Sequence, residues 1–130
     1  MPSISVLVAD DFEDWRRQVH LLLQVRPEWQ VIAEASDGRE AIQKAEELKP
    51  DLIVLDFSLP NLNGIEAARQ IRQLSPTSKI VFLSQNKDLN VVRAALGTGA
   101  QGYVYKMDVR RDFCLLSKGF YGVSNLSVAA

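Results

Sequence analysis

The sequence has a single cysteine, Cys114, among its 130 residues. One cysteine cannot form a disulfide within the chain, so a reducing compartment fits this composition. The chain also lacks a run of about 18 apolar residues, which is the length that spans a bilayer. Residues 1–3 lack the basic and then apolar pattern of a signal peptide. These absences predict a cytoplasmic protein that makes no contact with a membrane.

Neither sign of charge is in excess. The chain has 15 Lys and Arg against 16 Asp and Glu, for a net charge of -1. Domains that bind nucleic acid usually carry a basic excess, so we expect no direct nucleic-acid binding. The hydrophobic share of 47% and the charged share of 24% are ordinary for a globular protein. A chain of this length and composition predicts one compact domain.

The apolar residues fall into five short runs that are rich in β-branched side chains. The runs are Ile4–Ala9, Trp29–Ala35, 52–55, 80–83 and 103–105. Three of them are almost continuously apolar, which is typical of strands covered on both faces in a parallel sheet.

Segments with helical spacing of apolar residues follow each run. They are 12–23, 41–48, 65–74, 89–96 and 109–120. Asp37 and Asn63 each stand three residues before a glutamate, which marks a helix start. Five alternations of strand and helix predict an α/β fold, a (βα)5 doubly wound five-stranded parallel sheet. Trp15 and Trp29 are expected to pack against this sheet.

Polar residues stand where the predicted strands end. They are Asp10, Asp11, Asp56, Ser84 and Lys106. Each alone has a structural explanation, such as a helix cap for Asp11 or a solvated charge for Lys106. Together they predict a site, because ligands of such sheets bind beyond the carboxyl ends of the strands.

The acids of this predicted site favour a cation. Two carboxylates about 4 Å apart repel by roughly 4 kcal/mol at an effective dielectric constant of 20, so the acids must either protonate or hold a cation. Oxygen ligands at a partly open rim suit Mg²⁺. An aspartate beside Mg²⁺ and a lysine is also a plausible phosphoryl acceptor.

The chain resembles the receiver domains of two-component response regulators over residues 4–120. The segments that carry the resemblance are 6–11, 51–56, 59–60, 63–64, 83–84 and 102–106. The resemblance implies a flavodoxin-like sheet of the CheY type, with strand order 2-1-3-4-5.

The resemblance also implies roles for the polar residues. Asp56 matches the phosphoacceptor, which takes a phosphoryl group from a sensor histidine kinase. Asp10 and Asp11 match the acid pair that holds Mg²⁺, together with Asp56 and the backbone carbonyl of Ser58. Lys106 matches the cation that pairs with the acyl phosphate.

Two further residues match the switch of the family. Ser84 matches a hydroxyl that turns toward a phosphoryl oxygen, and Tyr103 matches an aromatic residue whose rotamer reports the state. A phosphoryl group adds a charge of about -1.5 to -2, which can draw Ser84 and Lys106 inward. Tyr103 can then fill the space that Ser84 leaves. We expect this change to switch dimerisation of the domain or its binding to another partner.

The output of the domain is expected to be control of transcription. Residues 59–67 resemble receivers of the NarL/FixJ type, which carry a C-terminal helix-turn-helix. We expect a receiver domain at 1–121 and a tail at 122–130, with no effector domain in this chain. Two residues depart from the family pattern: Met107 stands where many receivers have a cis-proline, and Gln85 stands where a small residue is usual.

We expect a phosphorylated signalling domain that is not an enzyme in the ordinary sense. Three alternatives to it remain open. One is a receiver-fold interaction domain that is no longer phosphorylated. Another is an aspartyl-phosphate hydrolase of the haloacid-dehalogenase type, which would want an acid where Ser58 stands. The third is a flavin-binding protein, which would want a phosphate-binding loop where Asp10 and Asp11 stand.

Overall fold

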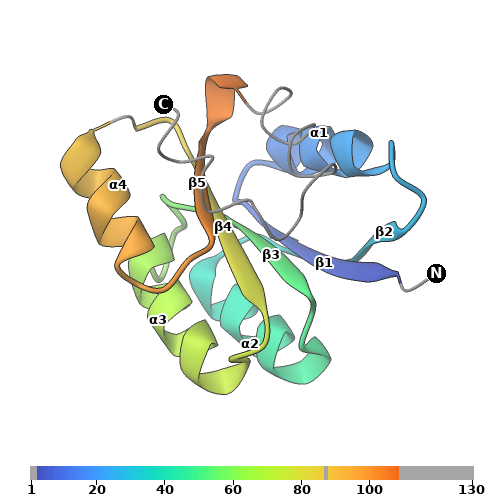
Figure 1. The fold of residues 1–130 in the computed structure, drawn as a ribbon, viewed down its shortest axis with the longest axis horizontal. Helices are drawn as coiled ribbons and strands as arrows, with labels where there is room; N and C mark the ends of the chain where they lie inside the picture. The colour runs from blue at the N-terminus through green and yellow to red at the C-terminus, as the bar shows by residue number, and fades with distance from the viewer. Residues whose placement is uncertain (1–2, 87, 109–130) are drawn as a thin grey trace.

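The computed structural model describes residues 3–86 and 88–108 (Figure 1). Its centre is a parallel sheet in the order β2-β1-β3-β4-β5, as the sequence and its family resemblance predict. The strands are β1 (Ile4–Ala9), β2 (Trp29–Ala35), β3 (Leu52–Asp56), β4 (Lys79–Ser84) and β5 (Gly102–Tyr105).

Four α-helices connect these strands. They are α1 (Glu13–Leu23), α2 (Gly38–Leu48), α3 (Gly64–Leu74) and α4 (Leu89–Leu96). A 3-10 helix, η1 (Lys106–Asp108), follows β5 directly. The helix expected over 109–120, with Cys114 in it, lies outside the described residues.

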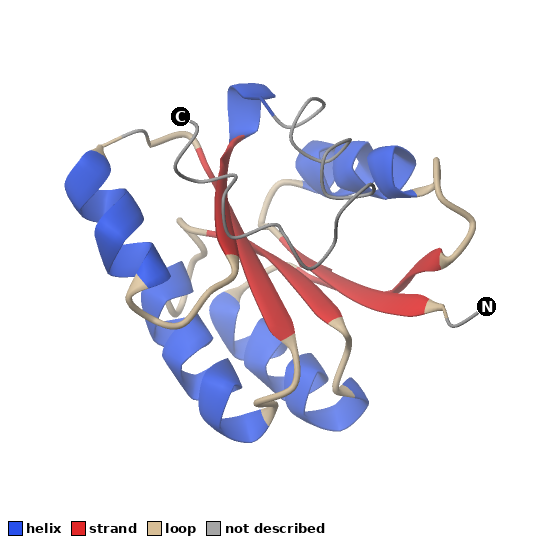
Figure 2. Cartoon of the chain, viewed as in Figure 1, coloured by secondary structure: helices blue, strands red, loops and turns tan. Residues whose placement is uncertain are grey.

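The sheet separates two apolar layers, because alternate residues of a strand point to opposite faces. On β1, Val6 and Val8 pack under α1 together with Val19, whereas Leu7 and Ala9 pack on the other face. That second face is covered by α2, α3 and α4 (Figure 2). Strands buried on both faces explain the nearly continuous apolar runs in the sequence.

Side-chain caps fix two of the helix starts beside the carboxyl ends of the strands. The Glu40 N–H donates to Asp37 Oδ1 (2.8 Å), and the Glu66 N–H donates to Asn63 Oδ1 (3.0 Å). Both caps agree with the sequence prediction. The carboxylate of Glu40 completes the first cap by accepting from the backbone N–H of Ser36 (2.7 Å).

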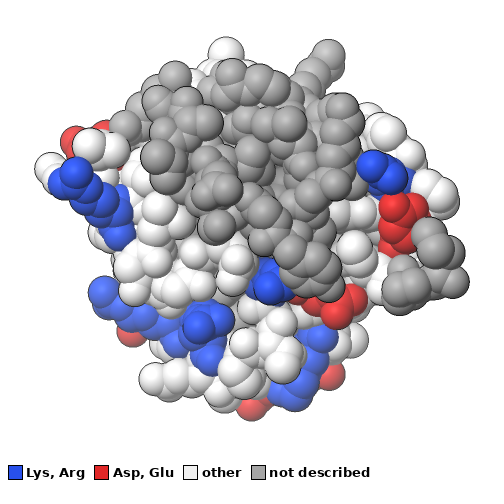
Figure 3. Space-filling model, in the orientation of Figure 1, with Lys and Arg blue, Asp and Glu red and all other residues white. Residues whose placement is uncertain are grey.

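The charges of the described surface are mixed in sign. In the part of the visible face that is not grey, both Lys and Arg side chains and Asp and Glu side chains are present (Figure 3). Among the described residues, no helix has both the length and the apolar character needed to cross a bilayer.

Candidate functional site

The carboxyl ends of four strands bring together polar side chains that are almost fully buried. Asp10 follows β1, Asp56 ends β3, Ser84 ends β4 and Lys106 follows β5. Their exposed fractions are 1%, 3%, 2% and 6%. Asp11 and Ser58 lie at the same rim but are exposed to solvent. The structure therefore assembles the polar residues that the sequence places at the strand ends.

Three of these residues form an acidic cluster. Asp10, Asp11 and Asp56 each offer a carboxylate oxygen, and the three oxygens lie within 4.8 Å of one another. Burial, and after it the negative charge of the neighbouring Asp10, raise the pKa of Asp56 from its ordinary value of 3.8 to about 6. Lys106 and the Ser58 N–H act in the opposite direction. The three carboxylates thus carry more negative charge than the single ammonium of Lys106 can balance.

Lys106 is the cation that faces this cluster. Its Nζ lies 3.0 Å from Asp10 Oδ2 and 3.5 Å from Asp56 Oδ1. Although the ion pair is close, Asp10 Oδ2 is buried and accepts no hydrogen bond from the described residues. A buried carboxylate oxygen normally has such a partner. The three acids together therefore fit a small divalent cation, because hard cations take carboxylate oxygens as ligands.

Backbone contacts hold Asp10 in place at the start of α1. Its Oδ1 accepts from the Phe12 N–H (2.9 Å), and its backbone carbonyl accepts from Arg16 Nη1 (2.7 Å). Arg16 is held in turn by Glu34 on β2, at 2.9 Å. The helix-cap explanation for Asp11 is wrong, because the N-cap residue is Phe12 and no side chain caps this helix. The carboxylate of Asp11 is therefore available to the cluster.

Ser84 and Tyr103 meet at the loop between β4 and α4. The Asn86 N–H donates to Ser84 Oγ (3.0 Å), and the Tyr103 hydroxyl donates to the Asn86 carbonyl (2.6 Å). Tyr103 is only 3% exposed, and its ring lies 6.3 Å from that of Phe57. The sequence-based hypothesis has Tyr103 enter space that Ser84 vacates. In this structure the Tyr103 ring is already inside.

A pocket of about 210 Å³ opens onto the acidic cluster. Its lining includes Asp56, Lys106 and Gln85, and also Trp15, which the sequence analysis assigned only to packing. The Lys106 ammonium lies 5.0 Å from the centre of the Trp15 ring. This contact had no signal in the sequence, because Trp15 and Lys106 are far apart in the chain. The peptide bond between Lys106 and Met107 is trans, since the described residues contain no cis bond.

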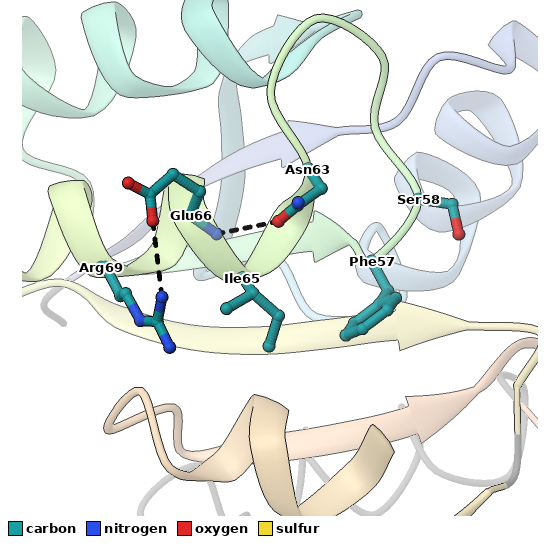
Figure 4. Close-up of a pocket in the computed structure, with 6 residues that line it drawn as sticks. All are labelled: Phe57, Ser58, Asn63, Ile65, Glu66 and Arg69. Carbon is teal, nitrogen blue, oxygen red and sulfur yellow. Dashed lines mark hydrogen bonds and ion pairs between the residues drawn. The ribbon is translucent and has the colours of Figure 1, made fainter. Parts of the chain in front are cut away.

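A larger hollow of about 440 Å³ lies beside the start of α3 (Figure 4). Phe57 and Ile65 supply apolar walls, and Glu66 pairs with Arg69 (3.6 Å). The figure shows Ser58 at one end of this hollow, with its side chain directed away from Ile65. The hollow contains one carboxylate that is already paired with a cation, so the acidic pocket is the stronger candidate for metal and phosphoryl chemistry.

Comparisons with known proteins bear on the family and the fold of the chain. The family model described as the response regulator receiver domain matches residues 6–114. The transcriptional regulatory protein DegU of Brevibacillus brevis is 37% identical over 104 residues, which cover 80% of this chain and 44% of that protein. A protein-glutamate methylesterase/protein-glutamine glutaminase of Geobacter sulfurreducens is 42% identical over 138 aligned residues, covering 99% of this chain and 36% of that protein. The chain thus spans less than half the length of these curated relatives.

A solved structure is similar over nearly its full length. The response regulator domain of Thermotoga maritima CheB has a TM-score of 0.82 and 31% sequence identity. The match covers 95% of this chain and 97% of that one. Relatives named as transcriptional regulators and relatives named as methylesterases both match this chain. The part that they share with it is the receiver domain.

Proposed function

Because the chain belongs to the response regulator receiver domains of two-component systems, we propose that Asp56 accepts a phosphoryl group. The donor is the phosphohistidine of a sensor histidine kinase. The observation that carries the proposal is the buried Asp56 carboxylate, which lines an open pocket together with Lys106. One Asp56 oxygen forms a bond to phosphorus as the phosphorus–nitrogen bond breaks. The electron pair returns to the imidazole, which takes up a proton.

The neighbours of Asp56 support this role by their charges. Asp10, Asp11 and Asp56 would hold Mg²⁺, with the backbone carbonyl of Ser58 as a further ligand. Bound Mg²⁺ supplies charge neutralisation for the incoming phosphoryl oxygens. The Ser58 N–H donates to Asp56 Oδ1 (3.3 Å), so the backbone of Ser58 lies next to the acceptor carboxylate. The ammonium of Lys106 would pair with a phosphoryl oxygen.

The added charge would act on the loop between β4 and α4. Ser84 would turn from the Asn86 N–H to a phosphoryl oxygen, and the loop that also binds the Tyr103 hydroxyl would move with it. We propose that this movement changes self-association or the affinity for a partner, and that the whole protein controls transcription, as the name of its relative DegU indicates. The domain itself acts as a phosphoacceptor, not as a turnover enzyme.

Beryllofluoride, which imitates a phosphoryl group, tests the proposal directly. The intact chain should bind it only when Mg²⁺ is present, and the fluorescence of Trp15, which borders the pocket, should change on binding. Asp56→Asn should show no change. A folded wild-type chain without a response would favour the receiver-fold interaction domain that is not phosphorylated.

Replacing Asp11 by asparagine should weaken Mg²⁺ binding by about 10- to 100-fold, because it removes one charged ligand next to a divalent cation. Asp11 is exposed, so the free energy of unfolding without metal should change by less than about 0.5 kcal/mol. Calorimetric titration with Mg²⁺ measures the first effect and urea unfolding the second.

The matched control for this substitution is Asp14→Asn. Asp14 is an exposed acid in the first turn of the same helix, and it pairs with Arg17 (3.7 Å). It is outside the group of three acids, so its loss should leave Mg²⁺ affinity within about twofold of wild type. Equal losses in both variants would argue against Asp11 as a ligand.

Replacing Gln85 by alanine should speed phosphorylation by acetyl phosphate by about three- to tenfold. Gln85 lines the same pocket as Asp56, and an alanine there removes a bulky amide from the path of a small donor. The initial rate at saturating Mg²⁺ is the measurement. Gln73→Ala, an exposed change on α3, is the control and should not alter the rate. A slower Gln85→Ala variant would show that the amide assists the reaction instead.

A further inference from the structure

Trp15 stands where the apolar layer under α1 meets the acidic pocket. It lies in the first turn of α1, which begins at Glu13, two residues after Asp11. The half-buried side chain packs against the cluster that contains Val8, Val54 and Val104. It also lines the pocket that contains Asp56 and Lys106. The apolar layer therefore fixes the ring at the border of the charged site.

The face of this ring is an electrostatic partner for Lys106. The ammonium lies 5.0 Å from the ring centre, within the range of about 6 Å over which an aromatic face attracts a cation. The Lys106 side chain is 7% exposed, so little water competes for the ammonium. A lysine side chain is flexible and carries a point charge, so contacts at its end decide where that charge stands.

The other contacts of the ammonium are carboxylate oxygens of the metal-binding cluster. Lys106 Nζ contacts Asp10 Oδ2 at 3.0 Å and Asp56 Oδ1 at 3.5 Å. A cation that takes these oxygens as ligands weakens both contacts, because it repels the ammonium. The ring is neutral and offers no oxygen to a metal, so its attraction for Lys106 remains. A carboxylate in its place would add a fourth negative charge to the cluster.

We infer that Trp15 is a positioning residue that holds the ammonium of Lys106 in the wall of the acidic pocket, where it meets the phosphoryl group. The inference rests on the proposed phosphoacceptor function. Trp15 touches neither the phosphoryl group nor the metal in this account. It acts through Lys106, and it does so by the face of its ring in addition to its packing.

The test is the affinity of the intact chain for beryllofluoride at saturating Mg²⁺, measured by calorimetric titration because the Trp15 variants lack this fluorophore. Trp15→Leu keeps an apolar side chain without a ring and should weaken binding about tenfold, which corresponds to about 1.4 kcal/mol. Trp15→Phe keeps a ring face and should stay within about threefold of wild type. If Trp15→Leu proves too unstable, Trp15→Met, whose unbranched side chain adapts to irregular packing, takes its place.

A spectroscopic readout separates position from packing. The methylene protons next to the Lys106 ammonium should show an upfield ring-current shift in wild type and in Trp15→Phe, and this shift should be lost in Trp15→Leu. Trp29→Phe is the matched control. Trp29 packs in the same apolar cluster but pairs with Ile4 at the opposite ends of the strands, so beryllofluoride affinity should not change.

The outcomes distinguish this inference from the function on which it rests. Failure of the wild-type chain to bind beryllofluoride would overturn the proposed function. If wild type binds and Trp15→Leu binds equally well, the positioning role is overturned while the function stands. Equal weakening in folded Trp15→Phe and Trp15→Leu would assign the effect to packing and also overturn the inference.

Discussion

Asp56→Asn should raise the free energy of unfolding by about 1–3 kcal/mol at neutral pH in the absence of metal ions. The ionised carboxylate of Asp56 is 3% exposed and lies beside Asp10, and its pKa is raised to about 6. Asparagine has nearly the same shape and carries no charge. The substitution that removes the phosphoacceptor should therefore make the domain more stable, as measured by urea unfolding.

The effect of Asp56 on stability has a definite pH dependence. Its pKa is about 6 in the folded chain and 3.8 ordinarily, so the folded state binds more protons between these values. The stability of the wild type should therefore fall as pH rises through this window, and the gain of Asp56→Asn should appear in the same window. Saturating Mg²⁺ should stabilise wild type more than the variant and narrow the gap.

Asp37→Asn is the control for this prediction. The Glu40 N–H, as the largest cause, lowers the pKa of Asp37, so the charge on this residue is favoured in the folded state. Its removal should leave stability unchanged or reduce it. A loss of stability in Asp56→Asn at neutral pH would mean that the Asp56 carboxylate is not under the electrostatic strain described here.

Lys106→Met should lower the free energy of unfolding by about 3–5 kcal/mol at neutral pH without metal. The substitution keeps much of the side-chain length but removes the ammonium that faces Asp10 and Asp56 at 3.0 and 3.5 Å. Two buried carboxylates then share a site without a cation. Urea unfolding at neutral pH measures the loss, which should exceed that of any exposed charge.

Protons and Mg²⁺ should both reduce this loss. Lys106 lowers the pKa of Asp56, so its removal raises that pKa, and the variant should lose less stability at about pH 5, where Asp56 is protonated. Lys44→Met is the control, because Lys44 forms a partly exposed ion pair with Glu40 and should cost less than about 1 kcal/mol. Similar losses for the two variants, or a loss that Mg²⁺ deepens, would contradict this account.

The sequence predicted the fold well because its signals are local and repeated. Runs such as Ile4–Ala9 are apolar on both faces, and Asp37 and Asn63 cap the helices that follow them. The order of the strands came from the family resemblance, since periodicity does not say which strands are neighbours. The helix expected over 109–120 lies outside the described residues.

The site was predictable as a set of residues but not in its contacts. The rule that ligands bind beyond the carboxyl ends of parallel strands identified Asp10, Asp56 and Lys106. The contacts of the Lys106 ammonium with Asp10 Oδ2 and with the Trp15 ring depend on side-chain rotamers. No sequence pattern encodes these rotamers. The hydrogen bond from the Tyr103 hydroxyl to the Asn86 carbonyl likewise depends on a rotamer that the sequence does not encode.

Phosphoryl incorporation at Asp56 is the most direct test of the central claim. The intact chain is incubated with acetyl phosphate and Mg²⁺, and its mass is recorded for wild type and for Asp56→Asn. Wild type should gain the mass of one phosphoryl group, which hydroxylamine removes as expected for an acyl phosphate, and the folded variant should gain none. An unchanged wild-type mass, or the same gain in the variant, would contradict the account.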